Sequence, residues 1–225
     1  MLNYRNATIV SVIGVLTTCA IAYYGWTNTE PGQQVPVHFD ASGEADRYGS
    51  RFEAFLIFPL VLVGVTILLA VLPRIDPRRT GMEKSVKAYS ATWMAVVVFL
   101  VAVSALTTRT IVNETTIGTR AAIEPRVLLV GIGLLLVVLG NYMPKTGSNW
   151  FFGFRTPWTL SNEEVWEATH TLGGPVMVAV GVIGILAALA LPLPWATGMA
   201  VALPLIAIVG LTVYSYVKYR ELSTA

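Results

Sequence analysis

The stretch NWFFGFRTPWTLSNEEVWEATH, residues 149–170, lies between two long apolar runs and holds the densest polar and aromatic chemistry of the chain. Three of the six tryptophans fall within it, together with an arginine, three glutamates and one of the two histidines. A connection that only joins two membrane helices needs no such material. We therefore expect this segment to form the functional surface of the protein. The apolar runs on either side of it should decide the fold.

Composition places the chain in a membrane. Of its 225 residues 55% are hydrophobic and only 12% are charged, against about 25% charged residues in soluble domains. A span needs about 20 mostly apolar residues to cross about 30 Å of hydrocarbon. Six stretches qualify: residues 7–24, 52–72, 88–108, 126–143, 172–191 and 196–217. The predicted fold class is all-α, a polytopic membrane bundle of six transmembrane helices, in which the glycine-rich fourth span lies centrally.

The lysines and arginines are shared unequally between the two sides of the membrane. If both termini lie on one side, that side holds ten of the 15. Positive residues stay in the cytoplasm, so we expect both termini inside, residues 149–170 inside, and the loop 26–51 outside. We divide the chain into an N-terminal two-helix unit, residues 1–87, and a four-helix unit, residues 88–225.

The outer loop is expected to be ordered but not helical. Its prolines and glycines disfavour a helix, while Val35, Val37 and Phe39 alternate as in a short strand. Oxygen-bearing side chains alternate after this strand, at Asp40, Ser42, Glu44 and Asp46. This spacing suits a calcium ion, but it is also typical of acidic turn residues in water. We favour the second interpretation and expect no metal.

Two further features have ordinary explanations. The loop PRIDPRRTGMEKSVK, residues 73–87, carries five positive charges, which favours an anchor on anionic lipid over a docking patch for a cytoplasmic partner. The single cysteine, Cys19, lies in an apolar run, and we expect it to be a buried structural thiol that forms no intrachain disulfide.

Within the central segment, the spacing of Ser161 and Glu164 is that of a capping box. It predicts a helix that starts at Ser161, is either short or runs bent into the fifth span, and lies at the cytoplasmic headgroup layer. On that helix Trp166 and His170 fall one turn apart, facing inward, while the glutamates face water.

The run GNYMPKTGSNWFFGFRTPWTLSNEEVWEATHTLGG, residues 140–174, resembles the signature of the SdpI family of bacterial membrane immunity proteins. An asparagine, a GxRTPWTL core and a tryptophan-to-histidine segment recur in that signature. The outer run VPVHFDASGEADRYGSR, residues 35–51, resembles a small domain of unknown function that often precedes it. The resemblance implies a multi-pass protein of the bacterial cytoplasmic (inner) membrane. One well-known member protects a sporulating bacterium from its own killing-factor peptide and, with toxin bound, holds a transcriptional repressor at the membrane.

The resemblance implies binding or signalling roles for the matching residues. On the inner side these are Asn149, Arg155, Thr156, Trp158, Asn162, Glu163, Trp166 and His170. In the outer loop they are Pro36, His38, Phe39 and Gly43, to which we add Asp40 and Asp46 from the acidic pattern.

Several of these residues also have structural interpretations. Arg155 either donates to backbone carbonyls and pairs with Glu163 or Glu164, or binds a lipid phosphate or a partner's carboxylate. Trp158 and Trp166 are typical of membrane-interface anchors. His170 is typical of a hydrogen-bonded structural histidine, although a histidine here could titrate near neutral pH.

We expect an immunity and signalling protein. Its outer loop would meet a membrane-active peptide toxin, and its inner loop would recruit a cytoplasmic repressor; membrane lipids are the other partners. Two alternatives stay open. One is a membrane-bound hydrolase or lipid-modifying enzyme, with or without a metal, that uses residues 155–170, and the other is a structural or assembly protein. We expect no catalytic residues and no cofactor, because His38 and His170 fall on opposite faces of the membrane. A net charge of +2 gives no reason to expect direct nucleic-acid binding.

Overall fold

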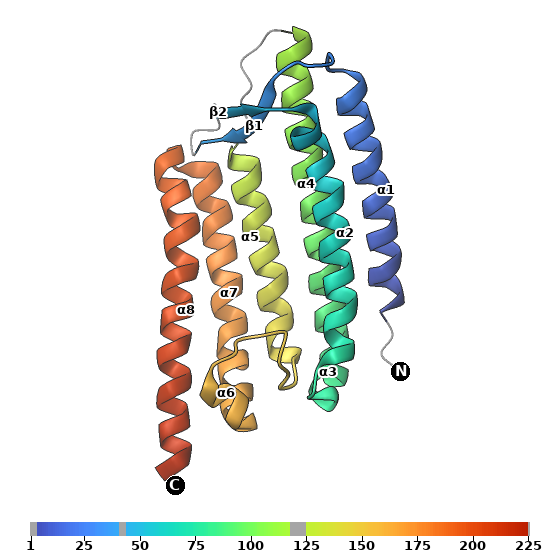
Figure 1. Ribbon diagram of the computed structural model, residues 1–225. Helices are drawn as coiled ribbons and strands as arrows, with labels where there is room; N and C mark the ends of the chain where they lie inside the picture. Colours follow the sequence, from blue (N-terminus) through green and yellow to red (C-terminus); the bar gives the residue numbers. More distant parts are fainter. Residues whose placement is uncertain (1–3, 41–43, 118–124, 225) are drawn as a thin grey trace.

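The computed structural model describes residues 4–40, 44–117 and 125–224 as long helices lying side by side (Figure 1). Six of the described helices are long and apolar enough to cross a membrane, which confirms the predicted all-α fold with six spans. They are α1 (Arg5–Thr27), α2 (Arg51–Ile75), α4 (Val86–Ile117), α5 (Pro125–Tyr142), α7 (Glu163–Ala190) and α8 (Leu193–Thr224). The shorter elements are β1 (Val35–Phe39), β2 (Ala45–Gly49), α3 (Arg79–Lys84), the 3-10 helix η1 (Met143–Lys145) and α6 (Pro157–Ser161).

The spanning helices are longer than the predicted apolar runs at most ends. The fifth span was predicted from residue 172, whereas α7 begins at Glu163, and the sixth continues to Thr224. Hydropathy falls where polar residues begin, but backbone hydrogen bonding continues into the aqueous layer. The functional segment is therefore joined rigidly to a span.

Two groups of three helices pack side by side. Helices α1, α2 and α4 contact one another, α5 contacts α7 and α8, and α4 contacts α5. In the first group the buried Trp93 of α4 donates from Nε1 to Ser11 Oγ of α1 at 2.8 Å. The division at residue 87 stays a prediction, since α4 contacts both α1 and α5.

Glycines let α5 and α7 approach closely, as the fourth span's composition predicts. A Cβ on Gly140 would lie 2.7 Å from the carbonyl oxygen of Gly174, and one on Gly133 would lie 2.8 Å from that of Gly181. No side chain fits between the two backbones there. Helix α5 lies between α4 and α7 (Figure 1).

Both ends of the described chain lie at one end of the bundle, with α3 and α6, while the β1–β2 hairpin covers the other end (Figure 1). An even number of spans requires this arrangement of the termini. Cys19 is exposed on α1, so the expectation of a buried thiol is wrong. A run that is apolar on all sides does not show which of its faces meets lipid.

The predicted strand of the outer loop is confirmed as β1, which pairs antiparallel with β2. Val35 is buried against Ala22, Phe55 and Ile111 of the helices below. Arg51 Nη1 donates to the carbonyls of Trp26, at 3.1 Å, and Thr29, at 2.6 Å. The hairpin is therefore fixed to the bundle by both apolar and polar contacts.

Candidate functional site

The segment 146–162, named here the signature loop, is held from inside by Asn149. This side chain is fully buried. Its Oδ1 accepts from the amides of Phe151, at 3.0 Å, and Phe152, at 2.6 Å, and its Nδ2 donates to the carbonyl of Gly147 at 2.9 Å. Because these bonds leave it turned inward, Asn149 shapes the loop and presents no free group to a partner.

The side chains of Trp166 and His170, both on α7, pack beneath the signature loop. Their rings are stacked, with centroids 4.0 Å apart and planes 19° apart. Trp166 Nε1 donates to the carbonyl of Thr146 at 2.9 Å, and His170 Nε2 accepts from the amide of Phe154 at 2.8 Å. Gly153 has φ +110°, and a Cβ there would lie 2.5 Å from His170 Nε2. Only glycine lets the loop lie so close to the histidine ring.

His170 is the hydrogen-bonded structural histidine that the sequence suggests. Its Nδ1 lies 2.8 Å from the carbonyl of Trp166. With Nε2 accepting from an amide, Nδ1 must carry the proton, so this network holds the neutral ring. Trp166 is 1% exposed, so the prediction that it anchors at the membrane interface is wrong, because the signature loop folds back over it.

The TPWTL part of the motif forms α6. Thr156 is its N-cap, and the side chains of Thr156 and Thr159 each accept from the other's backbone amide in a capping box. Trp158 reaches α8, where its Nε1 donates to Ser215 Oγ at 2.6 Å and its ring meets Tyr216 edge-on at 5.3 Å. Trp158 thus connects the loop to the last span, while Thr156 caps α6.

The next helix starts one residue later than predicted. Asn162, not Ser161, is the N-cap of α7, and its Oδ1 accepts from the amides of Glu164, at 2.8 Å, and Val165, at 3.2 Å. Ser161 ends α6 and donates to the carbonyl of Trp158. The helix expected from Ser161 is therefore the first part of α7, which runs on into the fifth span, and the separate short helix is α6.

The basic loop, residues 73–87, belongs to the site, although its composition favoured a lipid anchor over a docking patch. Asp76, which is 6% exposed, accepts from the amide of Trp150 at 3.0 Å through Oδ2. Arg78 Nη1 donates to Ser148 Oγ at 2.5 Å, and its Nη2 donates to the carbonyl of Leu160. The basic loop and the signature loop, whose bonded residues here lie 70 to 82 positions apart, therefore form one structure.

Backbone contact completes this junction. The amide of Gly147 donates to Ser85 Oγ at 3.0 Å. A Cβ on Gly81 would lie 1.7 Å from the carbonyl oxygen of Ser148, so the two backbones touch. Sequence reasoning missed these residues, and the only available signal was a carboxylate and small residues within a run of positive charge.

Arg155 and Glu163 lie at the surface of the site. Arg155 Nη1 donates to the carbonyl of Trp150 at 2.6 Å, which is the carbonyl-binding alternative for this residue. Glu163 pairs instead with Lys84 of the basic loop, Oε1 to Nζ at 3.3 Å. Both partners of that pair are more than half exposed, so it contributes little stability.

The outer candidates lie at the opposite end of the bundle. His38 Nδ1 is 2.6 Å from Asp46 Oδ1, and Asp40 Oδ1 accepts from the amide of Glu44 at 3.1 Å. Pro36 is buried and Phe39 is partly exposed on β1. Gly43 lies outside the described residues. Within residues 4–40, 44–117 and 125–224, no three histidine, cysteine, aspartate or glutamate side chains gather as metal ligands do.

Comparison with known proteins supports the resemblance. Residues 145–215 match the SdpI/YfhL protein family, and residues 13–63 match a domain of unknown function, DUF1648. The chain is 33% identical over 100 residues to the Immunity protein SdpI of Bacillus subtilis (strain 168). That match covers 42% of this chain and 45% of the relative, so the chain spans less than half of that protein. No solved structure matches.

The two matched regions correspond to the two motif-rich ends of the bundle. The DUF1648 region runs from α1 through the outer hairpin into α2. The other region begins in η1 and takes in the signature loop, α7 and most of α8. Residues 145–215 of this multi-pass membrane protein are thus similar to the SdpI/YfhL family, and residues 13–63 to DUF1648.

Proposed function

We propose that this chain is an immunity protein of the bacterial cytoplasmic membrane, which protects its cell against a membrane-active peptide. The observation that carries the proposal is the family match over residues 145–215, together with the similarity to a protein named for immunity. The matched loop is a hydrogen-bonded structure fixed to the bundle, which is the preorganisation that a recognition site requires.

The outer hairpin is the proposed toxin-facing surface. His38 and Asp46 are exposed there as a pair, and the aromatic side chains of Tyr48 and Phe52 are about half exposed nearby. Exposed aromatic rings beside polar groups favour contact with an amphipathic peptide. The proposal assigns signalling, including recruitment of a cytoplasmic repressor, to the exposed Arg155 and Glu163 at the other end.

Survival under toxin tests the function. A toxin-sensitive bacterium that expresses the chain is challenged with a membrane-active peptide, and survivors are counted against the empty vector. We expect more survivors with the chain, and fewer for His38→Ala or Arg155→Ala than for Lys87→Ala at equal expression. If survival with the chain does not exceed survival with the empty vector, the immunity function is contradicted. If the three variants survive equally, only the binding roles of His38 and Arg155 are contradicted.

Sidedness is tested separately by labelling. In a Cys19→Ser background, single cysteines are placed at two exposed sites, Glu44→Cys near the hairpin and Glu167→Cys on α7. A membrane-impermeant maleimide should label the first in intact cells and the second only after permeabilisation. Labelling of both in intact cells would contradict the proposed division between outer and inner surfaces.

A further inference from the structure

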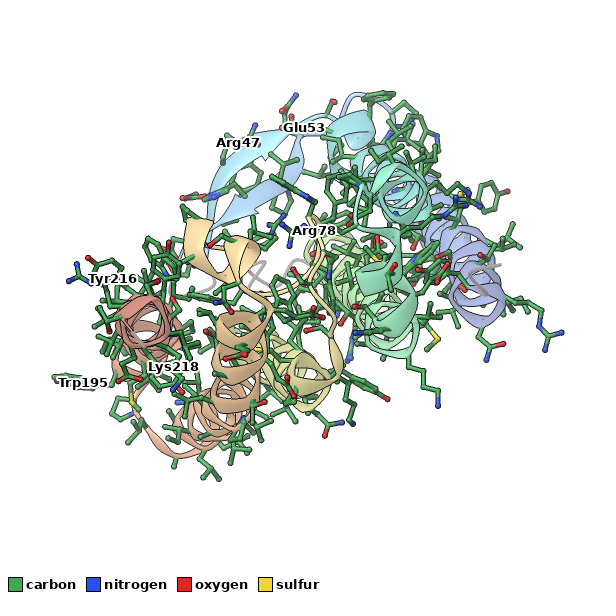
Figure 2. All side chains as sticks on the ribbon, turned by 90° about the horizontal axis from the view of Figure 1, so that it is seen from below. Arg47, Glu53, Arg78, Trp195, Tyr216 and Lys218 are labelled. Carbon is green, nitrogen blue, oxygen red and sulfur yellow. The ribbon has the colours of Figure 1, made fainter. Side chains whose placement is uncertain are left out.

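A polar cleft opens where the basic loop meets the signature loop. Its volume is about 520 Å³, within the roughly 300–1,000 Å³ of small-molecule sites. The polar side chains that line it are Arg78, Arg79, Thr80, Lys84, Ser148, Ser161 and Glu163. Figure 2, which views the molecule from this end, places Arg78 in the middle of the face. Since its walls come from both loops, the cleft exists only because the loops are joined.

The charges that line this cleft are predominantly positive, with three cations facing one carboxylate. The Arg78 guanidinium is held in place by Ser148 Oγ and the Leu160 carbonyl. These bonds use two of its five N–H donors and leave three for another acceptor. Arg79 is exposed and makes no hydrogen bond or ion pair to any residue among those described.

We propose that this cleft binds a phosphate group, carried by an anionic phospholipid headgroup or present as free phosphate. Arg78 supplies an oriented fork of donors, which suits phosphate oxygens, and Arg79 and Lys84 supply the balancing charge. The Thr80 hydroxyl lies in the same wall. Because the cleft lies at the end of the bundle that carries most of the positive residues, a headgroup reaches it from the adjoining leaflet. The proposal does not depend on the immunity function.

Binding is measured on the full chain purified in a neutral detergent. One arm uses inorganic phosphate, and another uses a soluble short-chain phosphatidylglycerol, with short-chain phosphatidylcholine as the zwitterionic comparison. Titration calorimetry gives affinity and stoichiometry for the parent, Arg79→Gln, Lys84→Gln and Lys87→Gln. Lys87 is the matched control, since it is an exposed cation of the same loop that does not line the cleft.

We expect saturable binding at one site per chain, about tenfold weaker in Arg79→Gln or Lys84→Gln and unchanged in Lys87→Gln, because each removes a charge-assisted hydrogen bond. Saturation by inorganic phosphate identifies free phosphate as a ligand, and saturation by phosphatidylglycerol alone identifies the lipid. No saturable binding of either overturns the proposal. Equal loss in all three variants also overturns it, since the loop's general charge would then explain the binding.

A gain of affinity provides an independent check. The Glu163 carboxylate pairs with the Lys84 ammonium group, Oε1 to Nζ at 3.3 Å. Its negative charge also repels an anion in the same cleft. Glu163→Gln should therefore bind phosphate severalfold more tightly, whereas Glu164→Gln, next to it on α7 and outside the cleft lining, should not. Weaker binding by Glu163→Gln would contradict the assigned geometry.

Discussion

Replacing Asn149 with alanine should release the signature loop without unfolding the bundle. The substitution removes the acceptor of two amide hydrogen bonds and the donor of a third. At about 1 kcal/mol for each bond, the closed loop loses about 3 kcal/mol relative to its open form. Since about 1.4 kcal/mol corresponds to a factor of ten, loop opening should become roughly a hundredfold more frequent.

Hydrogen exchange of the Phe151 and Phe152 amides measures this opening, because both donate to the Asn149 side chain. The loop lies beyond the apolar part of the spans, so peptides that cover it are accessible to solvent exchange. Asn141→Ala is the matched control: Asn141 is exposed at the end of α5 and makes no side-chain hydrogen bond among the described residues. We expect roughly hundredfold faster exchange at both phenylalanine amides in Asn149→Ala and no change in the control.

Exchange within about threefold of the parent would refute this argument. It would mean that the loop is held mainly from outside, by the basic loop, α7 and α8, and that its buried asparagine contributes little. Equal acceleration in Asn141→Ala would instead indicate a general loosening of this end of the bundle.

Three further substitutions test other parts of the structure. Gly153→Ala requires an unfavourable positive φ and moves the loop off His170, so the thermal unfolding midpoint should fall by the equivalent of about 1–3 kcal/mol. Gly140→Val meets the Gly174 carbonyl of α7 and should lower the midpoint by a similar amount, about 1–3 kcal/mol. Arg51→Ala removes two hydrogen bonds to carbonyls, and hydrogen exchange should show faster opening of the hairpin, by about 2 kcal/mol.

Each of these has a control in the chain. A Cβ on Gly184 of α7 or Gly64 of α2 meets nothing within 4 Å, so Gly184→Val and Gly64→Ala should leave the midpoint nearly unchanged. Arg47, which is exposed, pairs with the partly exposed Glu53 at 2.6 Å (Figure 2), and such a surface pair contributes about 0–1 kcal/mol. If Arg47→Ala increased hairpin opening as much as Arg51→Ala does, the hydrogen bonds of Arg51 to carbonyls would not explain the stability of the hairpin.

The spans and the outer strand could be predicted because their signals are local. Length and hydropathy identify a span, and alternation around Val37 identifies β1. The pairing of Trp166 with His170 also follows from helical spacing alone. Each of these depends on residues within a few turns of one another.

The sequence-based predictions were wrong or incomplete where two local signals competed, or where residues distant in the sequence contact one another. Ser161 and Asn162 are both residue types that favour the N-cap position. Asn162 is the N-cap of α7 because α6, which begins with its own capping box, continues through Ser161. The contacts of Asp76 and Arg78 with the signature loop join residues 70 or more positions apart. No periodicity in the sequence carries that information.

The position of the signature loop changes how its residues should be interpreted. It is bonded to the first helix group through Asp76 and Arg78, and to the second through Trp158 and Trp166. It therefore links the two groups at the end of the bundle that carries the termini. Two elements that share such a link are coupled only if the link has two arrangements of different ligand affinity. Under the proposed functions, a ligand would act on the exposed residues of the cleft and on Arg155, whereas Asn149 and His170 bond to the backbone of the link itself.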